Sequence, residues 1–352
     1  MGIYDTTTML AGVRKMMPLA RWFANRYFPD GTVFPTKKVL IEYKKGNKKM
    51  APFVIPRKGG ITVEREGYIS MEYVPPYIAP QRALTIDDLN AKGFGESLYT
   101  TKTPQQRQAE VLGEDLSELS DMIDRRHEWM CREIILKGEV IMKHYAEKYG
   151  VGTPVEKVLR FYESAFENEY TPTINWGKAG CDIYGDLESM VEMLVNVGCP
   201  ATDLNMSADA YREFLKDTTI KELLNNRRME LGHINPKELP NGVTYAGTIV
   251  VFGKTLDIFI YAEQFEDEDG VVKSFMPSGT VFIGAPGMGE TIYGAISQLE
   301  DYDGQFHTYQ DKKVPKYLSD SRNEVREVRL ASAPIPKPVD VNAWVVATVI
   351  GE

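Results

Sequence analysis

The segment Thr103–Gly150 reads TPQQRQAEVLGEDLSELSDMIDRRHEWMCREIILKGEVIMKHYAEKYG. Apolar side chains recur in it at spacings of three, four and seven, the period of one stripe on an amphipathic helix. These side chains are Leu112, Leu116, Leu119, Ile123, Met130, Ile134 and Ile141. The pattern predicts one helix over residues 103–149.

Both ends of this segment carry helix signals. Thr103 and Gln106 form a capping box around Pro104 at the first helical position, and Gly150 with Pro154 supplies a stop. A helix of this length would span roughly 65–70 Å at 1.5 Å per residue. An element that long serves as a strut, which indicates a subunit shaped to meet neighbours.

The composition is that of a folded chain with about two domains. It has 352 residues, 43% of them hydrophobic, and a formal net charge of -9. The negative charge argues against a protein that coats nucleic acid, and we expect no membrane span because no apolar stretch is long enough. Cys131, Cys181 and Cys199 form no CxxC pair, so we expect buried, reduced thiols.

The first 36 residues combine an amphipathic piece with an aromatic cluster. The cluster consists of Trp22, Phe23, Tyr27 and Phe28, and Pro29-Asp30-Gly31 then predicts a turn. Aromatic side chains in a terminal arm need a surface on which to be buried. That surface is either the parent domain or a neighbouring subunit, and the sequence leaves both open.

Residues 37–80 have a strand-like and strongly basic character. Strands are predicted at 39–43, 53–55, 61–63 and 68–69, with a turn at Gly46-Asn47. The cations are Lys37, Lys38, Lys44, Lys45, Lys48, Lys49, Arg57 and Lys58. This basic hairpin is either a solvated face or a projecting loop that docks on an acidic partner surface.

Beyond the long helix the chain changes to a mixture of helices and strands. A strand is predicted at 157–162, and helices are predicted to start at Asp186, Ser207 and Thr219, the first of them ending at Gly198. From Val243 onward the pattern is that of a β-meander. Its strands are predicted at 248–252, 256–261, 271–275, 280–283, 291–296, 325–330 and 344–350.

Signatures of chemistry are weak throughout. Gly284–Thr291 has the spacing of a phosphate-binding loop, but Glu290 stands where the lysine should be and β-forming residues follow, so we expect a connection between strands. His127 and Cys131 provide only two of the ligands that zinc needs. Glu266–Gly270 lacks calcium-loop spacing and is expected to be an acidic hairpin tip. We expect no catalytic site, metal or cofactor.

Read end to end, the chain resembles the major capsid proteins of lambda-like tailed bacteriophages. No single motif is specific, but their order covers nearly the whole chain, and the first 30 residues match least. The motifs are Tyr73–Pro80, Leu84-Thr85, Leu136-Lys137-Gly138, Val243–Gly247, Gly270–Pro277, Thr291–Gly294 and Ala331–Pro334.

The resemblance implies an α+β chain with the Hong Kong 97-type phage capsid fold. In that fold residues 1–36 are an N-terminal arm and residues 37–80 an extended β-hairpin loop. A peripheral domain would comprise the spine helix within residues 81–185 and the final strands at 331–352. An axial domain would comprise residues 186–330.

The implied function is self-assembly into hexamers and pentamers of an icosahedral head shell, built in the bacterial cytoplasm, that encloses double-stranded DNA without sequence-specific binding. A separate scaffolding protein is expected because the chain begins almost directly with the arm; portal and decoration proteins are further expected partners. The alternatives are a soluble enzyme built on residues 186–330, for which the chain offers no convergent titratable cluster, and a binding module.

Inter-subunit contacts are expected from the arm, the basic loop and the first half of the long helix, which is acidic. We expect the loop of one subunit to approach the helix of its neighbour. The residues concerned are Trp22, Phe23, Lys44, Lys45, Lys48, Lys49, Arg57, Lys58, Glu110, Glu114, Asp115, Glu118, Asp121 and Asp124. Deletion of residues 1–30 is expected to abolish shell formation and to leave a folded core.

Overall fold

The computed structural model divides the chain into two compact units. Unit 1 comprises Met1–Val39, Val74–Glu133 and Glu290–Lys337, and unit 2 comprises Leu40–Tyr73, Ile134–Gly289 and Pro338–Glu352. The structure describes residues 5–16, 19, 21–36, 39–43, 69–84, 104–144, 155–162, 166–225, 232–240, 242–300, 303–320 and 325–351.

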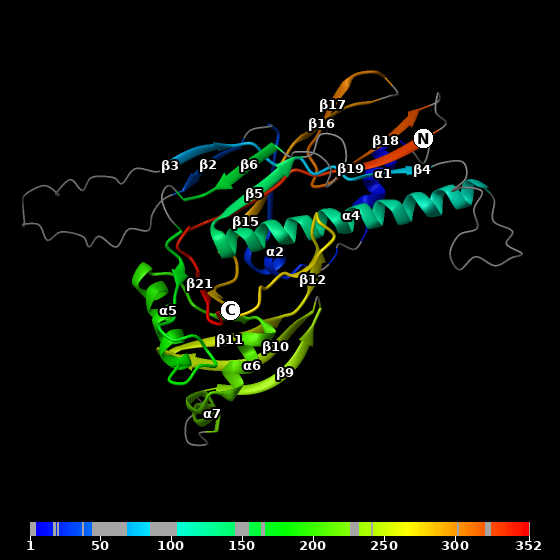
Figure 1. The fold of residues 1–352 in the computed structure, drawn as a ribbon. Helices are drawn as coiled ribbons and strands as arrows, with labels where there is room; N and C mark the ends of the chain where they lie inside the picture. Colours follow the sequence, from blue (N-terminus) through cyan, green and yellow to red (C-terminus); the bar gives the residue numbers. More distant parts are fainter. Residues whose placement is uncertain are drawn as a thin grey trace, which may run out of the picture. The chain divides into compact units, whose positions relative to one another are not determined.

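Unit 1 contains the arm, most of the long helix and three small sheets (Figure 1). Among its described residues the sheets have the strand orders β1-β15-β20, β18-β19-β4 and β16-β17. Its elements are α1 (Thr6–Val13), α2 (Trp22–Tyr27), β1 (Asp30–Phe34), β4 (Gln81–Leu84), α4 (Pro104–Lys137), β15 (Gly289–Gly294), β16 (Ile296–Leu299), β17 (Phe306–Tyr309), β18 (Val314–Asp320), β19 (Val325–Ala331) and β20 (Pro334–Pro338).

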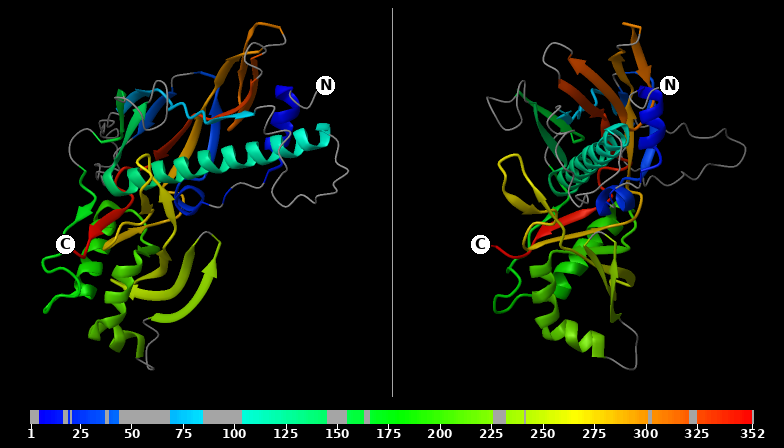
Figure 2. Two further views of the ribbon diagram at one scale, coloured as in Figure 1. Left: turned by 45° about the vertical axis from the view of Figure 1, so that its right-hand side comes forward. Right: turned by 90° about the vertical axis from the view of Figure 1, so that its right-hand side faces the viewer.

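The apolar stripe of α4 forms a core with the arm and β19. Four of the seven predicted stripe residues belong to it, from Leu112 to Ile123, and α1 lies beside that helix (Figure 2). Burying each such aliphatic side chain contributes roughly 1.5–3 kcal/mol. The buried side chains of this core are Met9, Val13, Leu112, Leu116, Leu119, Ile123, Val328 and Leu330.

The long helix is shorter than predicted. It has 34 residues and ends at Lys137, because Gly138 adopts a left-handed φ of 70° that stops the helix. The next residues form β5 (Glu139–His144), which pairs antiparallel with β6 (Val155–Arg160). The prediction of helix to residue 149 is therefore wrong, and Ile141 lies on a strand with its side chain exposed.

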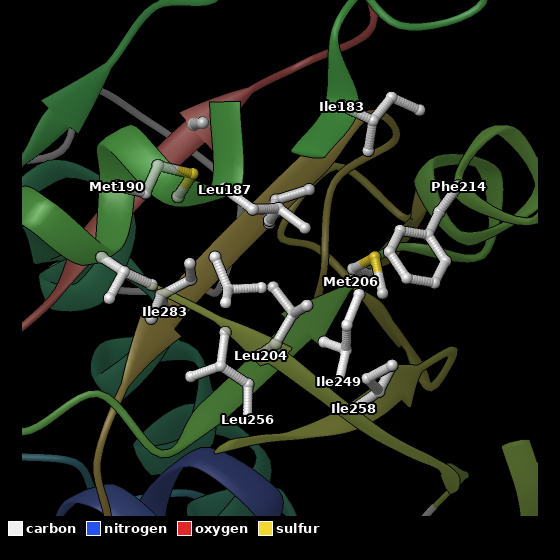
Figure 3. Close-up of a cluster of buried hydrophobic side chains, with 14 of the residues drawn as sticks. Ile183, Leu187, Met190, Leu204, Met206, Phe214, Ile249, Leu256, Ile258 and Ile283 are labelled. Carbon is white, nitrogen blue, oxygen red and sulfur yellow. The ribbon is translucent and has the colours of Figure 1, made fainter. Parts of the chain in front are cut away.

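Unit 2 is built around a seven-stranded mixed sheet of described residues, in the order β7-β21-β14-β8-β11-β10-β9. Helices α5 and α6 contribute apolar side chains to the core that forms on this sheet (Figure 3). The elements are β2 (Val39–Tyr43), β3 (Ile69–Tyr73), β7 (Glu169–Tyr170), α5 (Ile183–Val197), β8 (Asp203–Met206), α6 (Ala208–Lys216), α7 (Thr218–Asn225), β9 (Gly232–Leu239), β10 (Val243–Val251), β11 (Lys254–Tyr261), β12 (Gln264–Glu266), β13 (Val272–Ser274), β14 (Thr280–Gly284) and β21 (Val345–Thr348).

Helix caps in unit 2 follow local side-chain chemistry. Ser207 accepts a hydrogen bond from the Ala210 N–H, as predicted. Two other helices begin a few residues earlier than predicted, since Asp182 caps α5 and the Asp217 carboxylate accepts from the Ile220 N–H at the start of α7. Asp182 therefore takes the place of the predicted Asp186, and Asp217 takes the place of the predicted Thr219.

The division into units differs from the predicted domains. The final strand β21, expected with the peripheral domain, pairs with β14 in the large sheet of unit 2. Residues 290–330, expected in the axial domain, lie in unit 1, where β15 pairs with β1 of the arm and β19 pairs with β4. Non-local strand pairing determines this division, and hydrophobic patterning along the chain does not reveal it.

Candidate assembly site around the long helix

The acidic side chains predicted on α4 differ in how much of their surface is exposed. Glu110, Glu114 and Glu118 are exposed, and Asp121 is half-buried. Asp115 and Asp124 are buried among residues of their own unit. The helix therefore offers a neighbour a narrower acidic surface than the sequence predicts.

A cation of the same chain already lies on part of this surface. Arg82 of β4 donates to the Asp115 carboxylate at 2.9 Å and lies 2.6 Å from the Glu118 carboxylate. Because Arg82 is less than half exposed, these contacts are partly protected from solvent. They attach β4 to the acidic half of α4.

The basic loop is described only at its base. Strands β2 and β3 pair as a two-stranded sheet, which agrees with a hairpin that leaves and rejoins unit 2. The cations of the loop tip, together with the predicted strands at 53–55 and 61–63, lie outside the described residues. These cations are Lys44, Lys45, Lys48, Lys49, Arg57 and Lys58.

The arm aromatics are buried within their own unit. Phe23 has no exposed surface and Trp22 is 8% exposed, so of the two docking surfaces left open by the sequence, the parent domain is the one observed. Glu128 of α4 holds them there. Its two carboxylate oxygens accept the Phe23 and Ala24 N–H groups at 2.7 and 2.8 Å, which satisfies the free donors at the start of α2.

The expected contact of Trp22 and Phe23 with a neighbouring subunit stays a prediction, and their burial leaves little side-chain surface for it. This packing also changes the result expected from the deletion. Removing residues 1–30 would also remove Met9, Val13 and the aromatic cluster from the core of unit 1. The shortened chain is expected to lose the folding of that unit, and it would not isolate an effect on assembly.

A buried polar network lies beside these aromatics. An Arg21 Nη1–H donates to Nδ1 of His127, and the second ring nitrogen, Nε2, lies 2.9 Å from the Thr291 hydroxyl. Arginine has only donors, so Nδ1 must accept and Nε2 must carry the proton. The Thr291 hydroxyl in turn donates to the Phe28 carbonyl at 2.9 Å. This chain of hydrogen bonds joins the arm to α4 and β15.

Two aspartates provide the negative charge of the network. Asp124 accepts from Lys313 Nζ at 2.7 Å and lies 3.5 Å from Arg21. Asp30 accepts from the Tyr293 hydroxyl at 2.6 Å and from Lys312 Nζ at 2.8 Å. With three cations and two carboxylates, the network has no electrostatic need for a charged His127.

The pKa values of these groups follow from their burial and partners. Burial, reinforced by the positive charge of Arg21, lowers the pKa of His127 to about 3, so this histidine is neutral at physiological pH. Burial also lowers the pKa of Lys313, despite the opposing effect of Asp124. Burial alone would raise the pKa of Asp30, but hydrogen bonds from Lys312 and Tyr293 bring it below its usual value.

The sequence of α4 carries a signal for this network that its apolar spacing does not capture. Ser120, Asp124, His127 and Cys131 recur at spacings of four, three and four, on the buried side of an amphipathic helix. Polar side chains on the buried side of an amphipathic helix indicate buried hydrogen bonds. Their partners Arg21, Thr291 and Lys313, far away in the sequence, carry no comparable signal.

The structure also shows the two segments whose sequences resemble a phosphate-binding loop and a calcium loop. Gly284 ends β14 and Gly289 begins β15, so the glycine-rich segment joins two strands, as predicted. The acidic segment after Glu266 connects β12 to β13, again as predicted. Among the described residues no group of three or more metal-ligating side chains comes together, and no helix is long and apolar enough to span a membrane.

Comparison with known proteins finds similarity to phage and prophage capsid proteins. The major capsid protein of Escherichia phage lambda is 23% identical over 352 residues, covering 98% of both chains, and that of Escherichia phage N15 is 22% identical over 351 residues with the same coverage. The crystal structure of the putative capsid protein of a prophage of Escherichia coli CFT073 superimposes with a TM-score of 0.66 at 19% identity, covering 98% of this chain and 99% of that one.

The structural similarity establishes the Hong Kong 97-type capsid fold. The sequence profile of one family, described as phage major capsid protein E, matches residues 5–349. That match includes the arm, both units and the final strand. The chain belongs to the phage major capsid protein E family.

Proposed function

We infer that this chain is the shell subunit of a tailed-phage head, assembling as hexamers and pentamers into an icosahedral container for double-stranded DNA. The observation that carries this function is the family match over residues 5–349, together with full-length coverage of the lambda protein. A shell protein acts by presenting complementary surfaces to copies of itself, so its functional residues are contact residues.

Sedimentation of the purified protein distinguishes this function from the enzyme alternative. A shell subunit gives capsomers, closed shells or tubes, whereas a soluble enzyme gives one small oligomer whose mass does not depend on assembly conditions. Only small, concentration-independent species under all conditions, including co-expression with the other head proteins, would contradict the shell function.

Partners and location follow as part of the same proposal. A closed shell needs an entrance for its genome, which supports a portal protein, and a defined curvature, which supports a scaffolding protein. Decoration proteins are further candidate partners. Assembly in the host cytoplasm is supported by the free thiols of Cys131, Cys181 and Cys199, since cysteines stay reduced in that compartment.

The basic loop of one subunit is proposed to approach α4 of its neighbour. The exposed carboxylates of Glu110 and Glu114 are the part of the acidic helix that supports this contact, since Glu118, also exposed, already pairs with Arg82 of its own chain. Asp121 is half-buried, while Asp115 and Asp124 are buried beside cations of their own chain. Exposed ion pairs contribute only about 0–1 kcal/mol each, so the contact sets register and assembly rate more than shell stability.

Charge reversal tests this contact. Changing Lys44, Lys45, Lys48 and Lys49 together to glutamate should slow assembly, and added salt should slow the unmodified protein. The matched control reverses four exposed lysines elsewhere, Lys157, Lys178, Lys237 and Lys254, and so changes the net charge equally. Equal assembly rates for both variants, measured by light scattering at low salt, would exclude electrostatic docking of the loop.

A further inference from the structure

A row of hydrogen-bond donors crosses the sheet β18-β19-β4 of unit 1 (Figure 1). Lys316 of β18 lies directly opposite Arg329 of β19, and Arg329 lies directly opposite Gln81 of β4. Residues directly opposite each other in an antiparallel sheet share a face, so two cations and an amide stand side by side. Like charges in opposite positions destabilise a sheet, so this row costs folding energy unless negative charge compensates it.

The donor row lies on the face of the sheet that is turned away from α4. Val328 and Leu330 belong to the core with α4 and α1, and Arg82 pairs with carboxylates of α4. Because side chains alternate along a strand, Arg329 and Gln81 point to the opposite face. They lie there beside the small apolar core to which β16 contributes.

Neither cation of the row has a carboxylate within ion-pair distance among the described residues. Lys316 is only 7% exposed, and the Arg329 Nε atom is buried without a hydrogen-bond acceptor. Lysine is almost never buried this far unless it is paired, and a buried donor without an acceptor requires an explanation. The chain has 50 carboxylates against 41 Lys and Arg side chains, so a shortage of acids does not explain the missing partner.

The carboxylates near the row have other positions or other partners. Glu327 lies on the same face, two residues from Arg329 along β19, but does not form an ion pair with it. The buried Glu300 carboxylate, after β16, accepts hydrogen bonds from three side chains of its own surroundings. Asp311, before β18, pairs with Arg14 of α1. The two opposed cations therefore remain without a neutralising group.

We propose that the donor row of Lys316, Arg329 and Gln81 binds a phosphate group. A tetrahedral oxyanion accepts on all sides, so it can accept from an ammonium, a guanidinium and an amide at once. Nε and one Nη of arginine form a fork that matches two phosphate oxygens, which provides the Arg329 Nε with its acceptor. A bound anion also converts the repulsion between the cations into attraction.

The source of the phosphate group is either the free ion or the DNA backbone. The small exposed fraction of Lys316 suits a free ion, which is smaller than a duplex. Because the donor row is complete within one chain, the proposal goes beyond the shell function and does not depend on it.

Calorimetric titration of the purified chain with inorganic phosphate, at constant ionic strength, tests the site. We expect one saturable site per chain. Lys316→Met keeps the aliphatic stem and should weaken binding by about tenfold or more, the effect of losing one charge-assisted hydrogen bond. Lys254→Met, at the exposed start of β11, should bind phosphate like the unmodified chain. No saturable binding to the unmodified chain, or equal affinity of the two variants, would overturn the proposal.

Thermal unfolding without phosphate gives an independent readout. Lys316→Met should raise the unfolding temperature, because it removes the repulsion from Arg329, whereas loss of a merely structural lysine would lower it. Phosphate should then stabilise the unmodified chain more than the variant. A lower unfolding temperature combined with equal stabilisation of both chains would contradict the proposal. If Lys316→Met misfolds, Gln81→Leu, at an exposed position of the row, replaces it in both experiments.

A short DNA duplex, titrated in the same way, identifies the source. Binding of inorganic phosphate without binding of the duplex assigns the site to the free ion. Duplex binding that is lost in Lys316→Met assigns it to the DNA backbone, and both results support a phosphate site. Duplex binding that Lys316→Met leaves unchanged, without a site for inorganic phosphate, would refute it.

Discussion

Single buried polar residues connect the arm to the long helix in unit 1. His127 accepts from Arg21 through one ring nitrogen and donates to Thr291 through the other, a pattern that only the neutral ring can make. Protonation would turn Nδ1 into a donor facing a donor and would place two positive charges side by side in a buried site. The stability of unit 1 therefore depends on pH.

The expected direction follows from the two states of His127. Its pKa is about 3 in the folded chain and about 6.5 when unfolded, so the unfolded state binds more protons between these values. The stabilisation is complete above about pH 6.5 and is lost as pH falls. At pH 5 the loss from this residue alone should be about 2 kcal/mol.

Urea unfolding of dissociated subunits between pH 5 and 8 measures this effect. His127→Gln keeps an acceptor and a donor without a titrating ring, so its unfolding free energy should fall less between pH 7 and 5. Identical pH slopes for His127→Gln and the unmodified chain would refute the role of His127.

The Glu128 carboxylate connects α4 to the start of α2. Glu128→Ala would leave the Phe23 and Ala24 N–H groups buried without their carboxylate acceptor, and we expect a loss of about 2–4 kcal/mol in unfolding free energy. Glu114→Ala, at an exposed position of the same helix, should change it by less than about 0.5 kcal/mol. Similar losses for both would show that Glu128 does not cap α2.

The end of α4 shows how one glycine terminates an element. Gly138 has φ 70°, and a Cβ added there would lie 2.3 Å from the Tyr162 ring and 2.7 Å from Phe166. Both rings are fixed by their packing, edge to face at 5.3 Å, and the Tyr162 hydroxyl donates to the Val341 carbonyl. Neither ring can move away without loss of these contacts.

Alanine scanning at two glycines separates backbone strain from crowding. Gly253→Ala has the same φ of 70° but no atom within 4 Å of the new Cβ, so it should cost about 1–2 kcal/mol from backbone strain. Gly138→Ala should cost about 1–3 kcal/mol more because of overpacking. Chemical denaturation of both variants provides the comparison, and equal losses would contradict the steric account.

The same helix shows how far the sequence predicts the fold. Its apolar stripe from Leu112 to Ile134 is confirmed, because local periodicity is sufficient there. Ile141 continued the spacing of seven by coincidence, and the β-forming run Val140-Ile141-Met142 after Gly138 was the signal for a strand. The partners of Asp124 and His127 come from segments far along the chain, whose approach no local pattern encodes.

The net negative charge of the chain suits a container for DNA. The chain has a net charge of -9, the same sign as DNA phosphate, so we expect DNA to be enclosed and released without adhesion. Empty shells are expected to retain little DNA, and what they retain should depend weakly on salt. Tight binding that falls steeply with ionic strength, measured by gel shift, would contradict this account.

Electron cryomicroscopy of the assembled protein measures whether many copies of this chain close into one shell. We expect closed particles with icosahedral order, built of fivefold and sixfold clusters, in which the density for each copy matches units 1 and 2. Particles that lack closed symmetry, or a single small oligomer with both units intact, would contradict it.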